Sequence, residues 1–476
     1  MALSLRVLWL TLAAFGRWAH HTAHHICVIC VICGLHSITA RMPLIGGSLI
    51  VSAMHSFYRI ALMTTIAVAG LASLSAQGDL TARARALHKQ VPLIDGHNDY
   101  PWALRGISPG RDFAAADITG SVPKLHTDIP RLRQGGVGGQ FWSVYVPSSM
   151  QGKEAVRATL EQIDIVHRMV QRWPQVLGTA RTAAEVERVF RSGRIASMMG
   201  MEGGHSIDSS LATLRMLHAL GVGYMTLTHG LNAPWADSAT DKPALGGLSK
   251  FGEEVVREMN WLGMLVDLSH VSPETMEDAI RVSEAPIIFS HSSAKALCNV
   301  PRNVPDNVLQ MLPKNGGVIM ITFVPGFISQ EVADHSAKSQ AAQQSLRAQF
   351  PNNDAYLNAA MERWRAENPE PRATLTQVAD HIDHVRKIAG IDHIGLGGDF
   401  DGISTVIQGL EDVSKYPDLT AELLRRGYTE QDIKKILGLN ILRVMRGAEQ
   451  VSGMLHKKRG PSTATIEMLD RVSTTQ

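Results

Sequence analysis

The pattern of hydrophobic and polar positions changes after the first 80 residues. Before that point there are two apolar stretches, one scattered through residues 3–35 and one running from Ile60 to Leu74. From Pro92 onward, short apolar runs rich in β-branched residues alternate with longer stretches of helical period. This alternation is typical of repeated strand–helix units built around a parallel sheet.

Eight of the short runs are predicted to be strands, and eight strands can close a parallel barrel. They are Pro92–His97, Gly138–Val146, Ile195–Glu202, Tyr224–His229, Met264–His270, Pro286–His291, Gly317–Phe323 and His393–Asp399. Amphipathic stretches between them would form an outer ring of helices, as in Lys153–Trp173, Leu248–Leu262 and Pro273–Ser283. The sequence therefore predicts an α/β fold, a (β/α)8 TIM barrel, as one domain over residues 80–451.

Two additions to this barrel are predicted. The segment from Asp334 to Asn368 follows the seventh strand and is polar on most faces, so we expect it to flank or cover the barrel mouth. Residues 417–445 predict two added C-terminal helices divided near Gly427, with Thr429 as the N-cap of the second. After Val451 the chain becomes polar, and residues 452–476 are predicted to be a C-terminal tail.

The N-terminal region has the layout of a targeting segment. A short cationic start at Met54 precedes the apolar run, and small residues follow it at Ser75 and Ala76. Residues 54–76 therefore predict a secretory signal peptide or an uncleaved anchor, which would place the protein outside the cytoplasm, in the periplasm or secreted. Residues 1–53 would then be an over-extended N-terminus, with translation starting at Met42 or Met54. Any membrane association is expected only through this hydrophobic segment.

Charge and cysteine content narrow the class of protein further. The chain has 46 Lys and Arg against 44 Asp and Glu, a net charge of +2, and no long basic block in its body, which argues against nucleic acid as a partner. Three of the four cysteines lie in the first 33 residues, so the barrel keeps Cys298 and no internal disulfide. The 20 histidines are more informative, because several of them end apolar runs.

Side chains that can bind metal stand at the ends of six of the eight predicted strands, which is where this fold builds active sites. His97 and Asp99 are two residues apart, so they point the same way along a strand and could hold one ion. Taken alone, this pair is more often a buried histidine bonded to a neighbouring aspartate. Glu202 lies beside glycines and could bridge two ions, or it could pair with His205.

Two more strands end in imidazole groups. His270 and His291 close runs of similar form, and neutral imidazole is a common zinc ligand. Together with His97, Asp99 and Glu202 they form the mixed nitrogen and oxygen ligand set that zinc accepts. The sequence therefore predicts a site for two zinc ions.

At these residues the chain resembles the renal, or membrane, dipeptidase family of zinc peptidases, which have amidohydrolase-like barrels. The similar segments run through nearly everything from Leu93 to Met445. They are Ile94–Asp99, Gly139–Val144, Glu202–Ser206, Thr226–His229, Asn232–Asp237, Ser290–Ser293, Arg302–Asp306, Gly397–Gly402 and Glu411–Arg426. The resemblance implies hydrolysis of dipeptides, with one zinc ion on His97 and Asp99, another on His270 and His291, and Glu202 bridging them.

The resemblance also implies roles for residues outside the metal cluster. His229 would hold the substrate or its tetrahedral intermediate. Arg302 would pair with the C-terminal carboxylate of the substrate, which suits the bidentate fork of guanidinium. Asp399 would orient or deprotonate the metal-bound water, with Asp401 as the alternative acid.

Some alternatives stay open at this point. The same cluster could act on cyclic amides, lactams or esters, and a non-catalytic binding barrel is a third, weaker interpretation. Cys298 matches a family cysteine, but no cysteine stands near Gln330 to pair with it, and no hydrophobic tail resembles the lipid-anchored C-terminus of animal members. A bacterial-type, secreted form fits best, and whether the chain forms a homodimer is left open.

Overall fold

A parallel sheet forms the centre of the protein in a computed structural model that describes residues 79–108 and 110–470. Residues 1–53 and the predicted targeting segment 54–76 lie outside the described residues. The strands are β1 (Leu93–Asn98), β2 (Val137–Ser143), β3 (Leu177–Thr179), β4 (Ile195–Glu202), β5 (Val222–Thr226), β6 (Leu265–Asp267), β7 (Ile288–Ser292), β8 (Val318–Ile321) and β9 (Ile394–Leu396).

Eight of these strands close the predicted barrel. Their order is β2-β1-β9-β8-β7-β6-β5-β4, and pairing of β2 with β4 completes the ring. The ninth strand, β3, was not predicted. It has three residues and pairs only with the start of β4, from Ile195 to Ser197, so it is too short to give a periodic pattern. The predicted (β/α)8 TIM barrel is confirmed.

Helices surround the barrel, and capping residues mark the ends of several of them. For α8, Ser249 accepts from the Gly252 amide at the start, and Gly263 takes the left-handed conformation at the end. The helices up to β9 are α3 (Tyr100–Ile107), α4 (Ile129–Gly135), α5 (Lys153–Arg172), α6 (Ala183–Arg191), α7 (Leu211–Ala219), α8 (Lys250–Leu262), α9 (Pro273–Val282), α10 (Asp306–Leu309), α11 (Leu312–Asn315), α12 (Pro325–Ile328), α13 (Gln330–Gln349), α14 (Asp354–Glu367) and α15 (Leu375–Ile388). The three helical stretches named from the sequence correspond to α5, α8 and α9.

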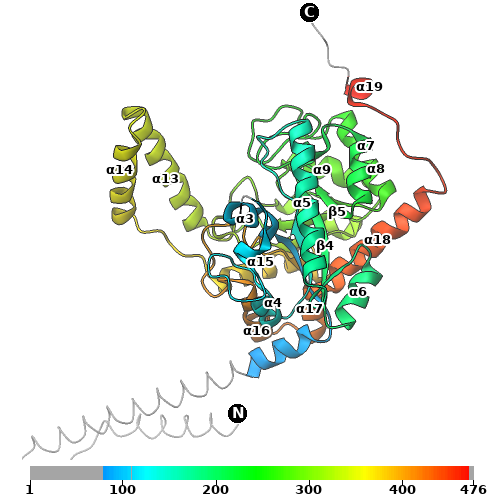
Figure 1. Cartoon of the computed structure of the whole chain (residues 1–476), viewed down its shortest axis with the longest axis horizontal. Coiled ribbons are helices and arrows are strands. Elements are labelled where there is room, and N and C mark those ends of the chain that lie inside the picture. The colour runs from blue at the N-terminus through cyan, green and yellow to red at the C-terminus, as the bar shows by residue number, and fades with distance from the viewer. Residues whose placement is uncertain (1–78, 109, 471–476) are drawn as a thin grey trace, which may run out of the picture. The chain divides into compact units, whose positions relative to one another are not determined.

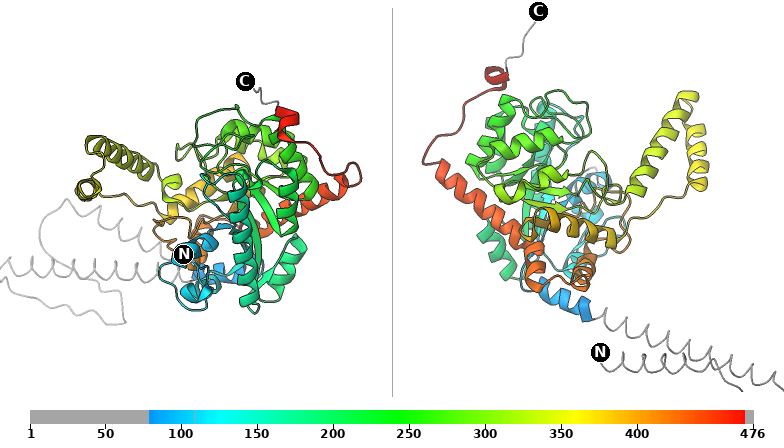
Figure 2. Two further views of the ribbon diagram at one scale, coloured as in Figure 1. Left: turned by 45° about the horizontal axis from the view of Figure 1, so that its top comes forward. Right: turned by 180° about the vertical axis from the view of Figure 1, so that it is seen from behind.

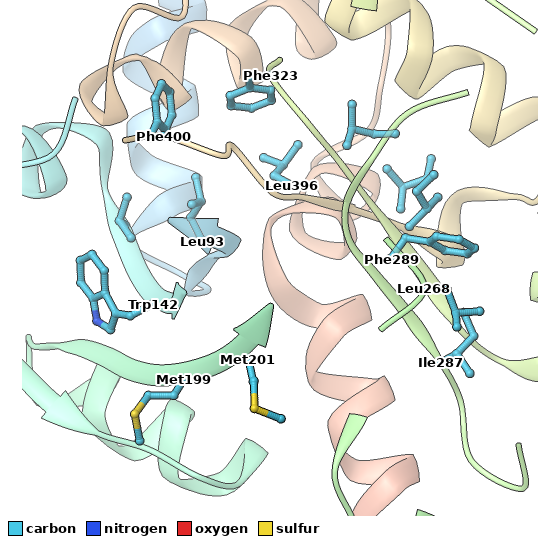
Figure 3. Close-up of a cluster of buried hydrophobic side chains, with 14 of the residues drawn as sticks. Leu93, Trp142, Met199, Met201, Leu268, Ile287, Phe289, Phe323, Leu396 and Phe400 are labelled. Carbon is cyan, nitrogen blue, oxygen red and sulfur yellow. The ribbon is translucent and has the colours of Figure 1, made fainter. Parts of the chain in front are cut away.

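The core has two layers, and successive residues of each strand alternate between them. Ile94, Met198 and Ile288 belong to a cluster at the centre of the barrel. Their neighbours Leu93 and Phe289 belong to the larger cluster between barrel and helices, part of which Figure 3 shows. Both sets are buried, which explains why the strands appear in the sequence as continuous apolar runs.

The segment after β8 forms a helical hairpin. It comprises α13 and α14, which Figures 1 and 2 show side by side and extending away from the barrel. Of the two expected positions, flanking or covering the mouth, covering is wrong: the residues from this side that line the pocket, Val324 and Phe327, come from the segment before α13. The physical reason is that α13 has apolar residues on no single face and buries only Val332.

The C-terminal helices follow the prediction, with one extension. The chain forms α16 (Tyr416–Arg425) and α17 (Glu430–Lys434), and Thr429 caps α17 in a capping box. A π-helical turn at Lys435–Leu439 then leads into α18 (Asn440–Leu455), so the predicted domain end at residue 451 falls inside a helix.

Part of the predicted polar tail packs on the barrel. It contains α19 (Ile466–Asp470), and the Asp470 carboxylate accepts from the Phe251 amide (3.0 Å) and the Ser249 hydroxyl (2.6 Å) at the start of α8. Among the helices of residues 79–470, none is both long and apolar enough to cross a membrane.

Candidate active site

The predicted site residues meet at the mouth of the barrel, where the strands end. A pocket of about 400 Å³ opens there. Its lining includes six of the eight predicted site residues and the alternative acid Asp401, together with aromatic and aliphatic side chains that the sequence did not single out. The lining residues are Asp99, Trp102, Tyr145, Glu202, His229, His270, Arg302, Val324, Phe327, Asp399, Asp401, Gly402 and Ile403.

The five predicted metal ligands converge, with Glu202 between the other four. One carboxylate oxygen, Oε2, lies 3.5 Å from His97 Nε2, which is itself 3.2 Å from Asp99 Oδ2. The other oxygen, Oε1, lies 3.0 Å from His270 Nε2 and 3.3 Å from His291 Nε2. The cluster therefore divides into two halves that share one buried carboxylate.

Local backbone geometry directs these side chains into the cluster. Glu202 continues the inward-facing set of β4 that includes Met198. His97 and His291 lie where the pairing of β1 with β2 and of β7 with β8 shifts register, which turns their side chains into the site. His270 lies three residues beyond the end of β6 with φ 69°, a conformation that ends a strand. The predicted strand run to His270 was therefore too long.

Neighbouring side chains fix which ring nitrogen is free in His97 and His291. The Tyr224 hydroxyl donates to Gly96 O and lies 2.8 Å from His97 Nδ1, so His97 Nδ1–H is the donor to Tyr224. In the same way Ser290 donates to Asp267 Oδ2 (2.6 Å) and accepts from His291 Nδ1 (2.8 Å). Both histidines then present a lone pair on Nε2 to the cluster, the arrangement that a metal ligand needs.

Three observations indicate that the cluster could hold cations. His97 Nε2 and Asp99 Oδ1 are buried and have no hydrogen-bond partner among residues 79–470. The spacing of the donor atoms, 3.0–3.5 Å, matches the roughly 3.3 Å that separates tetrahedral ligands of zinc. The predicted ligands, with Asp399 and His229, form three sets of three side chains. Within each set the atoms that could bind a metal lie within 4.8 Å of one another.

Electrostatics point the same way. Burial would raise the pKa of Glu202, but the surrounding histidines, His97 first, outweigh it and hold that pKa well below the usual range. Burial lowers the pKa of His97, but Tyr224, Glu202 and Asp99 together raise it well above the usual range. The carboxylates therefore stabilise positive charge in the cluster, and bound cations would supply that charge.

His229 lies beside the cluster, on the open side. Its Nε2 is 3.7 Å from Glu202 Oε1, and its ring packs on Tyr145 and His270 with centroids 5.0 and 4.3 Å away. Burial lowers its pKa, so the imidazole is neutral and can donate one N–H. A group bound at the cluster would therefore meet a hydrogen-bond donor there.

Arg302 is a buried cation whose hydrogen bonds reach only neutral oxygens. Its Nη1 donates to Ser292 Oγ (2.9 Å) and its Nη2 to His291 O (3.1 Å), while Nε has no partner within the described chain. Burial lowers its pKa to about 10. A buried charge without a counter-ion is costly, so this guanidinium is suited to receive an anionic ligand from the pocket.

Asp399 and Asp401 lie on one tight turn after β9 and both line the pocket, but only Asp399 belongs to a set of metal-ligating side chains among the described residues. Its Oδ1 is 4.0 Å from His97 Nε2, and burial raises its pKa well above the usual range, assisted by Asp99 and Glu202. The Asp401 carboxylate instead accepts from the His126 amide (2.6 Å), with its side chain 1% exposed. Of the two carboxylates, Asp399 is the nearer to the metal-ligating atoms.

The groups that support the ligands were not predicted from the sequence. Tyr224 and Ser290 lie inside predicted strands and had no reason to stand out from other buried residues. Asp267 has a stronger signal, because it is an acidic residue within an apolar run three positions before His270. The alternative partner for Glu202 is wrong: His205 Nε2 bonds Val146 O (3.2 Å) instead.

A parallel barrel with imidazoles and carboxylates gathered at its mouth defines a metal-dependent hydrolase. Comparisons with known proteins agree. A family model described as "Membrane dipeptidase (Peptidase family M19)" matches residues 81–459. Dipeptidase verJ of Clonostachys rogersoniana is 44% identical over 385 residues, which cover 79% of this chain and 88% of that protein.

Two crystal structures are similar as well. The probable dipeptidase PvdM from Pseudomonas aeruginosa has a TM-score of 0.68 and 26% identity, covering 78% of this chain and 99% of that one. A metallo peptidase from Rhodobacter sphaeroides, solved with a phosphinate mimic of the dipeptide L-Ala-D-Ala, has a TM-score of 0.61 and 25% identity, covering 75% and 99%. The chain belongs to the membrane dipeptidase family M19, and it is a hydrolase that acts on dipeptides.

Proposed function

We propose that this protein hydrolyses dipeptides with two bound zinc ions, and that it recognises the free C-terminal carboxylate through Arg302. The observation that carries the proposal is the division of the cluster by Glu202, whose two oxygens face separate pairs of ligands. Nitrogen and oxygen donors in equal measure suit zinc better than the all-oxygen sites that calcium and magnesium prefer. His97 and Asp99 would hold one ion, and His270 and His291 the other.

The chain's own residues then divide the work of hydrolysis. Two zinc ions would supply a water molecule of lowered pKa and would polarise the peptide carbonyl. Asp399 Oδ1 takes the proton from the attacking water and passes it to the leaving nitrogen. His229 Nε2–H donates to the carbonyl oxygen as negative charge develops on it. Arg302 binds the terminal carboxylate and thereby sets the length of the substrate.

The test compares a dipeptide with its C-terminal amide, in wild-type protein and in Arg302→Met. Loss of the buried charge pair should reduce kcat/KM for the amide by about 30-fold or more in the wild type. Arg302→Met should cleave both substrates equally slowly, and Arg302→Lys should recover part of the preference. Equal cleavage of dipeptide and amide by the wild type would contradict carboxylate recognition.

The same assay separates the alternative substrates. A cyclic amide, a lactam and an ester of similar size belong in the panel, because the cluster alone could activate water against any of them. The account requires the dipeptide to have the highest kcat/KM. A lactam or ester that exceeded it would transfer the proposal to another amidohydrolase reaction.

We also propose that the protein acts outside the cytoplasm. The support is the layout of residues 54–76, which lie outside the described structure. Cell fractionation with N-terminal sequencing tests this, and we expect either a mature chain that begins after residue 76 in the extracytoplasmic fraction or, for an uncleaved anchor, a membrane-bound chain that faces outward. A cytoplasmic protein that retains residues 54–76 would overturn it.

A further inference from the structure

The turn that carries Asp399 is braced by a histidine from a distant part of the chain. His126 and Asp401 exchange two hydrogen bonds. The His126 amide donates to Asp401 Oδ1 (2.6 Å), and the Asp401 amide donates to His126 Nδ1 (3.0 Å). Since Nδ1 is the acceptor in the second bond, the ring must carry its proton on Nε2.

This turn needs external support. Asp399 and Asp401 both have left-handed backbone conformations, φ 60° and 67°, and each such non-glycine residue costs about 1–3 kcal/mol. The first half of the turn is held by β1, because the Asp399 amide donates to His97 O (3.1 Å) and the Asp99 amide to Phe400 O (2.9 Å). The second half is held by His126.

The turn is also closely packed against the Asp99 and Asp399 side chains. A Cβ on Gly402 would overlap the Asp99 carboxylate and lie 2.6 Å from Asp399 Oδ1. Any relaxation of the turn at Asp401 would therefore move Asp399 relative to the cluster.

The segment that carries His126 is itself fixed. The adjacent Thr127 Oγ1 accepts from Asn98 Nδ2 (2.7 Å) at the end of β1, and His126 O accepts from the Val413 amide (3.3 Å). The ring lies against Phe400, with centroids 6.0 Å apart.

The charged groups that face this ring are Asp401, Arg131 of α4 and Asp412. Arg131 is itself paired with Asp128 (2.7 Å) and Asp412 (3.4 Å). His126 does not line the substrate pocket. Its hydrogen bonds with Asp401 and its contact with Phe400 connect it to the turn.

We propose that His126 is a positioning residue for the hydrolysis. Its Nδ1 accepts a hydrogen bond from the Asp401 amide, and this bond holds Asp399 Oδ1 toward the metal cluster. The inference rests on the proposed role of Asp399. It assigns the Asp401 side chain a structural part in the same brace, rather than a part in proton transfer.

The experiment compares His126→Leu with His126→Asn in the zinc-loaded, full-length protein. Leucine removes the acceptor, whereas the asparagine side-chain oxygen can take the place of Nδ1. His126→Leu should lower kcat on the order of 10- to 100-fold, because a small displacement of a reacting group has an effect of that size. KM and zinc content should stay within about twofold of wild type, since neither pocket nor ligands change. His126→Asn should restore most of kcat.

A matched control lies at the start of β9, the strand whose other end leads into the turn with Asp399 and Asp401. His393 is a buried histidine just before β9, and its Nδ1 bonds Gly317 O (2.7 Å). His393→Leu should lower Tm and leave kcat within about twofold of wild type. Asp399→Asn, measured in parallel, tests the proposed function separately.

Each outcome decides one proposal. If Asp399→Asn loses activity while His126→Leu keeps the kcat of the wild type, the positioning role is overturned and the proposed function stands. If His126→Asn is as slow as His126→Leu, or if zinc content falls in step with kcat, the positioning role is also overturned. If Asp399→Asn keeps its activity, the proposed role of Asp399 fails, and with it this inference.

Discussion

At the scale of single residues, two imidazoles of the cluster, His97 and His291, have a hydrogen-bond partner behind the ring. For His291 the partner is Ser290, whose hydroxyl donates to the buried Asp267 carboxylate and accepts from Nδ1. Asp267 is held in turn by the Ser290 and Ser269 amides and the Thr226 hydroxyl. The chain from carboxylate to hydroxyl to imidazole sets the tautomer and the direction of the ring.

Removal of the middle member of this chain tests its role. Ser290→Ala should weaken zinc binding by roughly 10- to 100-fold, the usual effect of losing a group that orients a ligand. Competition with a chromogenic chelator measures the affinity directly. The control is Ser197→Ala, because Ser197 Oγ is buried without a hydrogen-bond partner in the described part of the chain. Equal zinc affinity in the two variants would remove Ser290 from the account.

At the scale of elements, strands β4 and β5 meet through a glycine that makes room for a tyrosine. A Cβ on Gly200 would overlap the ring of Tyr224, the residue whose hydroxyl bonds His97 Nδ1. The inward-facing positions of β4 thus alternate a large residue, a glycine and a ligand: Met198, Gly200 and Glu202. One small residue sets how closely two strands and a metal ligand approach.

Gly200→Ala should therefore affect both stability and the site. Overpacking of a buried contact costs roughly 1–3 kcal/mol, and a displaced Tyr224 would release His97. Urea denaturation and a zinc titration measure the two effects. The control is Gly453→Ala in α18, where an added Cβ meets no atom within 4 Å, so the free energy of unfolding should hold or rise by up to about 1 kcal/mol. Unchanged zinc affinity in Gly200→Ala would contradict the link through Tyr224.

The sequence predicted the elements better than their ends. Eight apolar runs and the helices between them were sufficient for the barrel, because strands buried on both faces leave an unmistakable pattern. The ends were placed too far along, since His229, His270 and Asp399 lie in loops. β6 ends at Asp267 and β9 at Leu396, and positive φ at His270 and Asp399 excludes an extended backbone at those two residues, a conformation that nothing in a run of apolar letters marks.

The site was predictable where the type and position of a single residue indicate its chemistry. Histidines and acidic residues at strand ends stand out, and the structure brings the five predicted ligands together. The groups behind them were not predictable from the chain alone. Tyr224 and His97 are 127 positions apart, and only the closed barrel brings them within 2.8 Å. His126 and Asp401, 275 positions apart, are a similar case.

At the scale of the whole molecule, buried histidines link segments that are distant in the chain. His381 on α15 accepts from the Ala294 amide (3.1 Å) and donates to Ile328 O (3.0 Å). His88 bonds Gly135 O and the Thr420 hydroxyl, each at 2.9 Å. Burial lowers the pKa of each to about 4. Both rings are therefore neutral in the folded protein at neutral pH.

This predicts a loss of stability in mild acid. The folded pKa of His381 lies below its ordinary value of 6.5, so the unfolded chain binds more protons as the pH falls. The stability is fully present above about pH 6.5 and declines as the pH approaches 4, by on the order of 3 kcal/mol for one such residue. Urea denaturation at pH 7.5, 6, 5 and 4 should give a shallower decline for His381→Asn than for wild type. Parallel curves would contradict the assignment.

The most direct test of the account is a zinc titration of metal-free protein, with hydrolysis of a dipeptide as the readout. The metal-free protein should be inactive, and the rate should rise with added zinc and reach its maximum at two ions per chain. A protein that cleaves the dipeptide at full rate without metal, or that binds two zinc ions and cleaves no dipeptide, would contradict the central claim.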